Sequence, residues 1–181
     1  MGIIVLNGLE IIEKIHDETF DIVVMVQGDE PLISPEAISL TIKSFTDNAI
    51  DVANIMSPIA SEEQFLDQNN VKVVCDSSNH ALYFSRLAIP HNWTGTEDVV
   101  NFMQTGIIAF KRNMLIDFNN MQESHLEKLE SVDMNRLLEA GIKIRMVTSD
   151  TVTLGVDTPE ELDKARIMMM DDYFFKKYCL S

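Results

Sequence analysis

Short apolar runs bounded by turn-forming residues alternate along the chain with segments whose apolar positions recur at helical spacing. The run Ile22–Val26 is apolar throughout and is followed at once by polar residues around Gly28, which predicts a fully buried strand of a parallel sheet. Ser34 is a good N-cap and Pro35 suits the first position of a helix. Apolar residues at helical spacing extend this predicted helix to Asn48.

The same reasoning predicts the other elements. They are strands over 51–57, 71–76, 81–85, 102–110 and 142–148, a short helix from Ser61, a helix over 126–140 stopped by Gly141, and a helix over 159–170. The opening β-α-β-α order predicts an α/β fold, into which the strands over 71–76 and 81–85 insert a hairpin. We expect one domain over 1–181, with the aromatic and basic tail 171–181 as a C-terminal arm.

The charge balance narrows the classes of partner. Fourteen Lys and Arg against 29 Asp and Glu give a net charge of −15, which disfavours nucleic-acid binding but allows a small phosphorylated substrate beside local cations. No apolar run is long enough for a membrane span, and Met1–Leu6 lacks the features of a secretory signal, so we expect a cytoplasmic protein. Cys75 and Cys179 are read as free thiols, and the four histidines show no ligand spacing.

The densest chemical signal is Gln27-Gly28-Asp29, directly after the strand Ile22–Val26. Ligands of open α/β sheets bind beyond the carboxyl ends of strands, and a carboxylate there suits Mg²⁺. The alternative is a solvated turn. Asp157 precedes the last helix, where Asp-Thr-Pro-Glu-Glu is also an ordinary helix start. Together, Asp29 and Asp157 could converge on one divalent ion that bridges phosphates.

Arg86 follows the apolar strand 81–85. Its planar guanidinium suits a phosphate or a carboxylate, and a surface ion pair is the alternative. The chain has no GxGxxG or Walker-type loop, so no complete phosphate cradle is seen.

Several of these segments form one ordered set. The set consists of Val23-Val24-Met25-Val26-Gln27-Gly28-Asp29-Glu30-Pro31-Leu32-Ile33, Val71-Lys72-Val73-Val74, Ala81-Leu82-Tyr83-Phe84-Ser85-Arg86 with Ile89-Pro90, Leu126-Glu127-Lys128-Leu129-Glu130, and Gly155-Val156-Asp157-Thr158-Pro159-Glu160-Glu161-Leu162. In this order they resemble the 3-deoxy-manno-octulosonate cytidylyltransferases, the CMP-Kdo synthetase family. The resemblance runs from about Asn7 to Arg166.

The resemblance implies a nucleotide-diphospho-sugar-transferase (Rossmann-like) α/β fold with a mixed sheet and a β-hairpin extension. It also implies Mg²⁺ as cofactor, CTP and a 2-keto sugar acid as substrates, and a cytoplasmic homodimer. The product would be a CMP-sugar for lipopolysaccharide or capsule synthesis, with pyrophosphate as the leaving group. By the same resemblance Asp29 and Asp157 hold Mg²⁺ as catalytic residues, and the substrate-binding residues are Gln27, Arg86, Gln104, Glu130 and Asp133.

Three departures accompany the resemblance. Only Asn7, Gly8 and Glu10 match the family's Asn/Ser-Gly-Thr-Glu/Asp-Arg segment, and we expect an N-terminally truncated chain that lacks the nucleotide-binding opening. Gln104 and Ile108 replace a His and a Tyr that face the sugar, and the segment 131–136 also differs, which suggests a related but altered sugar acid. The alternative function is a catalytically incomplete module that only binds a sugar acid or dimerises.

Overall fold

A computed structural model of the chain describes residues 3–6, 20–95, 99–150, 154–156 and 158–179. Within them, seven strands form one mixed sheet. The strands are β1 (Ile3–Leu6), β2 (Ile22–Val26), β3 (Val52–Pro58), β4 (Lys72–Cys75), β5 (Ala81–Ser85), β6 (Phe102–Lys111) and β7 (Ile144–Thr148). The main order is β1-β2-β6-β3-β7, and the hairpin β4–β5 joins through β4 to β6. This confirms the mixed sheet with a hairpin extension.

Strand β6 gives the sheet its mixed character. It runs antiparallel to β2, β3 and β4, whereas β1 is parallel to β2 and β3 is parallel to β7. The prediction that Ile22–Val26 belongs to a parallel sheet therefore holds on one edge of β2 and is wrong on the other. Only its first three residues are buried, because its carboxyl end opens toward polar surroundings.

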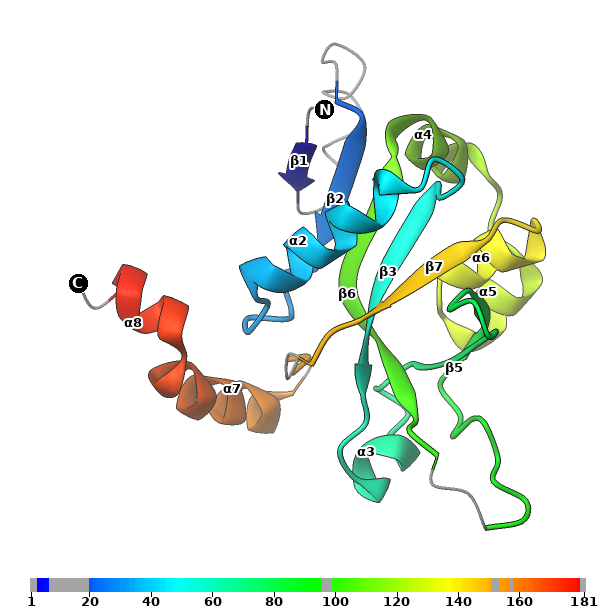
Figure 1. The fold of residues 1–181 in the computed structure, drawn as a ribbon. Helices are drawn as coiled ribbons and strands as arrows, with labels where there is room; N and C mark the ends of the chain where they lie inside the picture. The colour runs from blue at the N-terminus through cyan, green and yellow to red at the C-terminus, as the bar shows by residue number, and fades with distance from the viewer. Residues whose placement is uncertain (1–2, 7–19, 96–98, 151–153, 157, 180–181) are drawn as a thin grey trace.

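The helices are α2 (Pro35–Lys43), the 3₁₀ turn η1 (Ser44–Thr46), α3 (Glu62–Leu66), α4 (Arg112–Asn120), α5 (His125–Glu130), α6 (Met134–Glu139), α7 (Pro159–Asp171) and α8 (Tyr173–Cys179). Helix α2 covers one face of the sheet, while α4, α5 and α6 lie on the other (Figure 1). Side chains of β6 alternate between these faces, so Ile107 packs in the core under α2 and Ile108 packs in the core under α6. Because both faces are covered, the central strands β3 and β6 are mostly apolar, with a few polar side chains such as Asn54 and Gln104.

Side chains at the predicted caps start three of these helices. Ser34 accepts a hydrogen bond from the Ala37 amide at the start of α2, and Ser61 accepts one from the Gln64 amide at the start of α3. Thr158 and Glu161 form a capping box at the start of α7. Helix α2 ends at Lys43 instead of Asn48, and the chain then tightens into η1.

The single helix predicted over 126–140 is wrong. Ser131 adopts a left-handed conformation with φ of 53°, which ends α5 before α6 begins. The predicted stop is confirmed, because Gly141 follows α6 with φ of 75°. Helix α6 is held separately by Asn135, whose carboxamide pairs with the backbone of Phe84 in β5 as a strand would.

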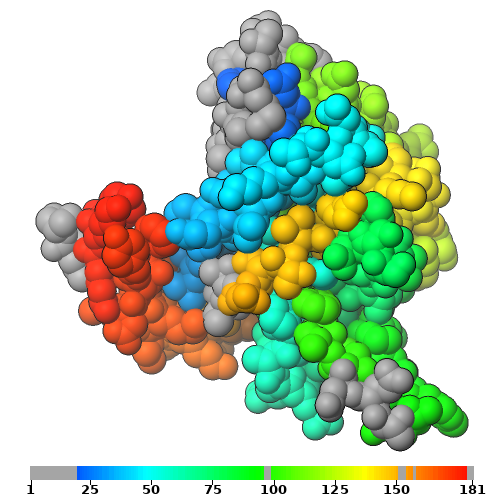
Figure 2. Space-filling view, viewed as in Figure 1, coloured from blue at the N-terminus to red at the C-terminus, as the bar shows by residue number. Residues whose placement is uncertain are grey.

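Two helices, α4 and α8, were not predicted. Helix α4 has no side-chain cap at Lys111, so the usual start signal is missing. Helix α8 occupies the tail expected to be an arm, and with α7 it stands to one side of the body (Figure 2). Within the described residues, no helix is long and apolar enough to cross a membrane. Cys75 is a free thiol whose pKa is raised to about 11 by burial and by Asp76, and the Cys179 side chain lies outside what the structure describes.

Candidate active site

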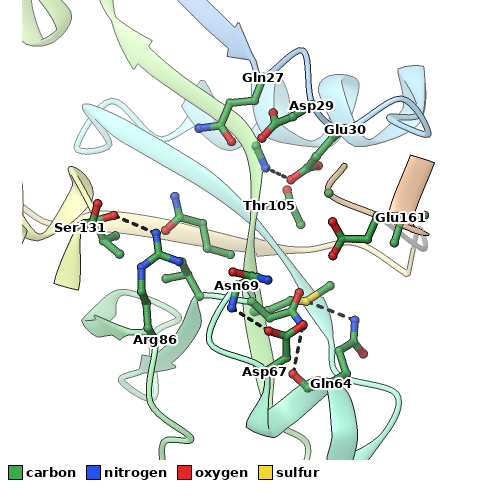
Figure 3. Close-up of a pocket in the computed structure, with 18 of the residues that line it drawn as sticks. Gln27, Asp29, Glu30, Gln64, Asp67, Asn69, Arg86, Thr105, Ser131 and Glu161 are labelled. Atoms are coloured by element: carbon green, nitrogen blue, oxygen red, sulfur yellow. Dashed lines mark hydrogen bonds between the residues drawn. The ribbon is translucent and has the colours of Figure 1, made fainter. Parts of the chain in front are cut away.

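A polar cavity of about 540 Å³ opens beyond the carboxyl end of β2. Figure 3 shows its side chains converging from the 27–30 loop, the 64–69 segment, β6, the end of α5 and the start of α7. Of the predicted site residues, the structure brings Gln27, Asp29, Arg86, Gln104 and Asp133 into its lining. Glu130 lies behind the wall. Asp157 lies outside the described residues.

The 27–30 loop is fixed against the backbone of Gly106 in β6. The backbone N–H of Gln27 donates to the Gly106 carbonyl at 2.9 Å, and the backbone N–H of Gly106 donates to Glu30 Oε1 at 2.6 Å. A Cβ at position 106 would lie 2.7 Å from Gln27 Cβ. Glycine is therefore required for Gln27 to sit where it does.

A bulge in β6 frees Gly106 for these contacts. Asn54 of β3 stands opposite Ile108 and Met56 stands opposite Gln104, so a two-residue step in β3 spans a four-residue step in β6. The buried Asn54 carboxamide fills the gap by donating to the carbonyls of Thr105 and Ile107 at 3.0 and 2.8 Å. Bulges of this kind re-aim side chains beside functional sites.

Two acidic side chains follow Gln27 in the same loop. Burial raises the pKa of the Glu30 carboxyl to about 7, against the Gly106 hydrogen bond, and the nearby Asp29 charge adds to the rise. Glu30 Oε2 is buried without a hydrogen-bond partner among the described residues. The Asp29 carbonyl accepts from the Val156 amide at 2.9 Å, which joins this loop to the segment leading into α7.

Arg86 lines the opposite wall of the cavity, and Glu130 supports it from behind. Arg86 donates from its guanidinium to the carbonyls of Glu130, Gln68 and Ser131 at 2.8, 3.0 and 3.2 Å. The Glu130 carboxylate accepts from Tyr83 Oη, Ser85 Oγ and the Arg86 amide. Burial alone would raise the pKa of Glu130, but these three donors outweigh it and hold the pKa below its usual range.

Two further predicted residues face the cavity from other elements. Gln104 Oε1 is buried and has no donor among the described residues, so it can accept a hydrogen bond from a ligand. Burial raises the pKa of Asp133, and the Glu127 carboxylate adds to the rise. Ile108, in contrast, is fully buried in the core and does not line the cavity.

One part of the wall, the loop between α3 and β4, was not predicted from the sequence. Asp67, Asn69 and Asn70 line the cavity from it. Asp67 accepts from the Asn69 amide at 2.9 Å, which forms a local turn. The run Asp67-Gln68-Asn69-Asn70 between a helix and a strand was the available signal, because such polar runs mark loops where function concentrates.

The described lining is strongly acidic. It carries six carboxyl side chains and two cationic ones, namely Asp29, Glu30, Glu63, Asp67, Asp133 and Glu161 against Arg86 and Lys164. An anionic ligand would meet repulsion here unless a cation accompanies it.

Comparison with known proteins identifies the family. The model of the family described as cytidylyltransferase matches residues 8–144. The chain belongs to the cytidylyltransferase family. Two 3-deoxy-manno-octulosonate cytidylyltransferases are similar to it: that of Flavobacterium johnsoniae, 40% identical over 89% of this chain and 67% of the relative, and that of Christiangramia forsetii, 37% identical over 88% of this chain and 65% of the relative.

A solved structure of a cytidylyltransferase shares the fold. It is CMP:2-keto-3-deoxy-manno-octonic acid synthetase complexed with CTP, and it matches with a TM-score of 0.80 and 35% identity over 89% of this chain and 66% of that one. The nucleotidyltransferase fold expected from the sequence is thereby confirmed. The chain spans about two thirds of the length of the curated cytidylyltransferases it matches.

Proposed function

We propose that the protein joins CMP from CTP to Kdo or a related 2-keto sugar acid, with release of pyrophosphate, in lipopolysaccharide or capsule synthesis. The observation that carries this proposal is the likeness to the synthetase solved with CTP. The polar cavity beyond the carboxyl end of β2 supports it, because ligands of α/β sheets bind at that edge.

In this reaction a sugar hydroxyl oxygen attacks the α-phosphorus of CTP. A new P–O bond forms, the P–O bond to the β-phosphate breaks, and the hydroxyl proton is lost to solvent. The chain contributes mainly by holding the reactants in line and by excluding water. The carboxamides of Gln27 and Gln104 provide neutral hydrogen-bonding groups for the hydroxyls of a sugar.

We also propose Mg²⁺ as the cofactor, held by Asp29 and Asp157. Among the described residues no group of three metal-ligating side chains is found. Mg²⁺ needs fewer, because it is usually bound by one or two carboxylates together with substrate phosphates and waters. When bound, the ion would neutralise charge on the phosphates of CTP. The acidic lining fits this requirement.

A cytoplasmic homodimer is proposed from the family resemblance. Exposed apolar side chains on α7 and α8, such as Ile167, Met170 and Tyr173, are compatible with a covered surface. Light scattering of the purified protein at several concentrations measures the assembly directly. A monomer at every concentration would refute the dimer.

The test of the reaction is pyrophosphate release from CTP with a panel of 2-keto sugar acids, with and without Mg²⁺. We expect release that requires both the sugar acid and the metal, together with formation of the CMP-sugar. Release without any sugar acid would contradict the proposal. Binding of a sugar acid without turnover, measured by calorimetry, would favour the non-catalytic module.

A further inference from the structure

Lys72 is a fully buried cation with no role in the proposed reaction. Its side chain has 0% relative exposure, and it does not line the cavity. Nζ donates to the carbonyls of Asp67, Asn70 and Arg86 at 2.7, 2.6 and 2.5 Å. All three partners are backbone groups, and no carboxylate forms a direct ion pair with Nζ among the described residues.

This arrangement is energetically costly. Burial lowers the pKa of Lys72, which shows that the site disfavours the charged form. Nζ is hydrogen-bonded only to neutral carbonyls, and the nearby charges of Asp67 and Glu130 offset the burial only in part. Apolar residues of similar volume in place of buried ionic groups are often neutral or stabilising. The cost therefore calls for a reason other than stability.

The three carbonyls show what Lys72 organises. Two of them belong to the loop of residues 67–70, which we name the clamp loop, and the third belongs to Arg86. Arg86 donates to a third carbonyl of the clamp loop, that of Gln68, and also to the carbonyls of Glu130 and Ser131. The two cations thus fasten the clamp loop to the end of α5.

Both fastened segments line the cavity. Asp67, Asn69 and Asn70 come from the clamp loop, and Ser131 follows α5. Figure 3 shows Arg86 and Ser131 on one side of the cavity, with Asp67 and Asn69 below. Asp67–Asn70 precede β4, which begins at Lys72. Toward α3 the loop is held by two hydrogen bonds, from the Asp67 amide to the Glu63 carbonyl and from the Asn70 carboxamide to the Gln64 carbonyl.

We propose that Lys72 is a positioning residue that sets the clamp loop against the side of the cavity lined by Arg86 and Ser131, to which we assign the sugar acid. It acts through the loop and touches no substrate. The inference rests on the proposed function for its kinetic readout. Polar loop side chains placed by such a clamp would contact the hydroxyls of the sugar acid and leave the nucleotide side unaffected.

The main test compares Lys72→Met with the wild type. Methionine is close to lysine in volume and removes all three donors. We expect the KM for the sugar acid to rise about tenfold or more, which corresponds to ~1.4 kcal/mol, while kcat and the KM for CTP change less than about threefold. The urea midpoint should change little, because removal of the buried charge offsets the loss of a donor at three carbonyls.

A matched control is Lys111→Met, which removes the same charge at the far end of β6, where Lys111 pairs with Asp51. It should leave all three kinetic constants unchanged. Lys72→Gln, which keeps two donors on a shorter side chain, should give an intermediate KM, and it replaces the methionine variant if that variant does not fold.

Hydrogen exchange gives a readout that needs no activity. Peptides covering residues 66–71 should exchange faster in Lys72→Met than in the wild type, while peptides in β7 should not change. If the wild type shows no turnover with any sugar acid, the proposed function fails. Hydrogen exchange then decides alone whether Lys72 holds the clamp loop in place. Unchanged exchange in the loop, unchanged KM in folded variants, or failure of both variants to fold would each overturn the proposal.

Discussion

The two walls of the cavity use their charged groups in opposite ways. On the wall formed by the 27–30 loop and β6, Glu30 Oε2 and Gln104 Oε1 have no partner among the described residues, and no hydrogen bond to the Asp29 carboxylate is seen there. The opposite wall is built on the hairpin β4–β5 and α5. There the charged groups of Lys72, Arg86 and Glu130 form hydrogen bonds within the protein.

This difference separates groups that can act on a ligand from groups that build the site. A polar group left unpaired at a buried site is unfavourable for folding and persists where a ligand completes it. A saturated group contributes to stability and geometry. Substitutions on the first wall should therefore lower activity more than stability, and substitutions of the saturated carboxylates of α5 on the second wall should do the reverse. Lys72 is the exception, because it is a buried charge without a direct ion pair.

Asp29→Asn should produce the largest effect. Removal of the carboxylate charge would weaken Mg²⁺ and phosphate binding, so we expect kcat/KM to fall by about 10²- to 10³-fold. The free energy of unfolding should stay within ~0.5 kcal/mol of the wild type, because no described group depends on this carboxylate. Steady-state kinetics and urea unfolding measure the two quantities. A large loss of stability with little change in kcat/KM would reverse the comparison.

Glu127→Gln should give the largest loss of stability. Glu127 and Arg136 form a largely buried ion pair, and Glu127 also accepts from the Ser124 amide at 3.0 Å. We expect unfolding to become easier by about 2–3 kcal/mol, because Arg136 loses its charged partner. Arg136 also packs over the Phe118 ring, so Glu127→Gln should loosen α4 as well as α5.

The same pair predicts a pH dependence. The hydrogen bond from Arg136 holds the pKa of Glu127 below its usual value of 4.5. Because the pKa of Glu127 is lower in the folded than in the unfolded state, its carboxylate stabilises the folded protein above pH 4.5. This stabilisation is lost as the pH falls through the lowered pKa. Urea unfolding is measured between pH 3 and pH 7, roughly the range in which carboxyl groups titrate. The free energy of unfolding should fall less steeply toward acid pH in Glu127→Gln than in the wild type. Parallel declines would count against this pair as its source.

Glu130→Gln tests the assignment of Glu130 to substrate binding, which stays a prediction. The amide nitrogen of glutamine would face donors that now meet a carboxylate, so we expect a loss of about 1–2 kcal/mol in unfolding free energy. If Glu130 acts only as scaffold, the KM for the sugar acid changes little. A rise in KM at unchanged stability would instead place Glu130 in contact with the substrate.

Gln104→Leu should have the smallest effect. It removes the unpaired acceptor but keeps much of the volume, so the KM for the sugar acid should rise about tenfold and the KM for CTP should not. Gln104→Asn serves as the matched control that retains the carboxamide. If the KM values of Gln104→Leu for both substrates equal those of the wild type, Gln104 has no part in sugar recognition.

Much of the fold could be predicted because its signals are local. Apolar runs marked the strands from β2 to β7, and Ser34, Ser61 and Thr158 marked helix starts. The site was predicted in part. The Gln27-Gly28-Asp29 segment pointed to the cavity because it directly follows a strand, whereas the clamp loop carried no motif that stood out from an ordinary polar loop.

The sequence by itself determined the strands from β2 to β7, the starts of α2, α3 and α7, the cytidylyltransferase family and the edge of the sheet where the cavity opens. Only the tertiary structure decided that Ser131 breaks the predicted helix, that β6 bulges at Gly106 and that Lys72 is buried. The reason is the range of the interactions. Hydrophobic period and capping act within a few residues, but Arg86 reaches carbonyls 44 and 45 positions away, and Asn54 fills a gap in a strand 51 to 53 positions later. Partners so far apart in the chain meet only when the sheet has formed.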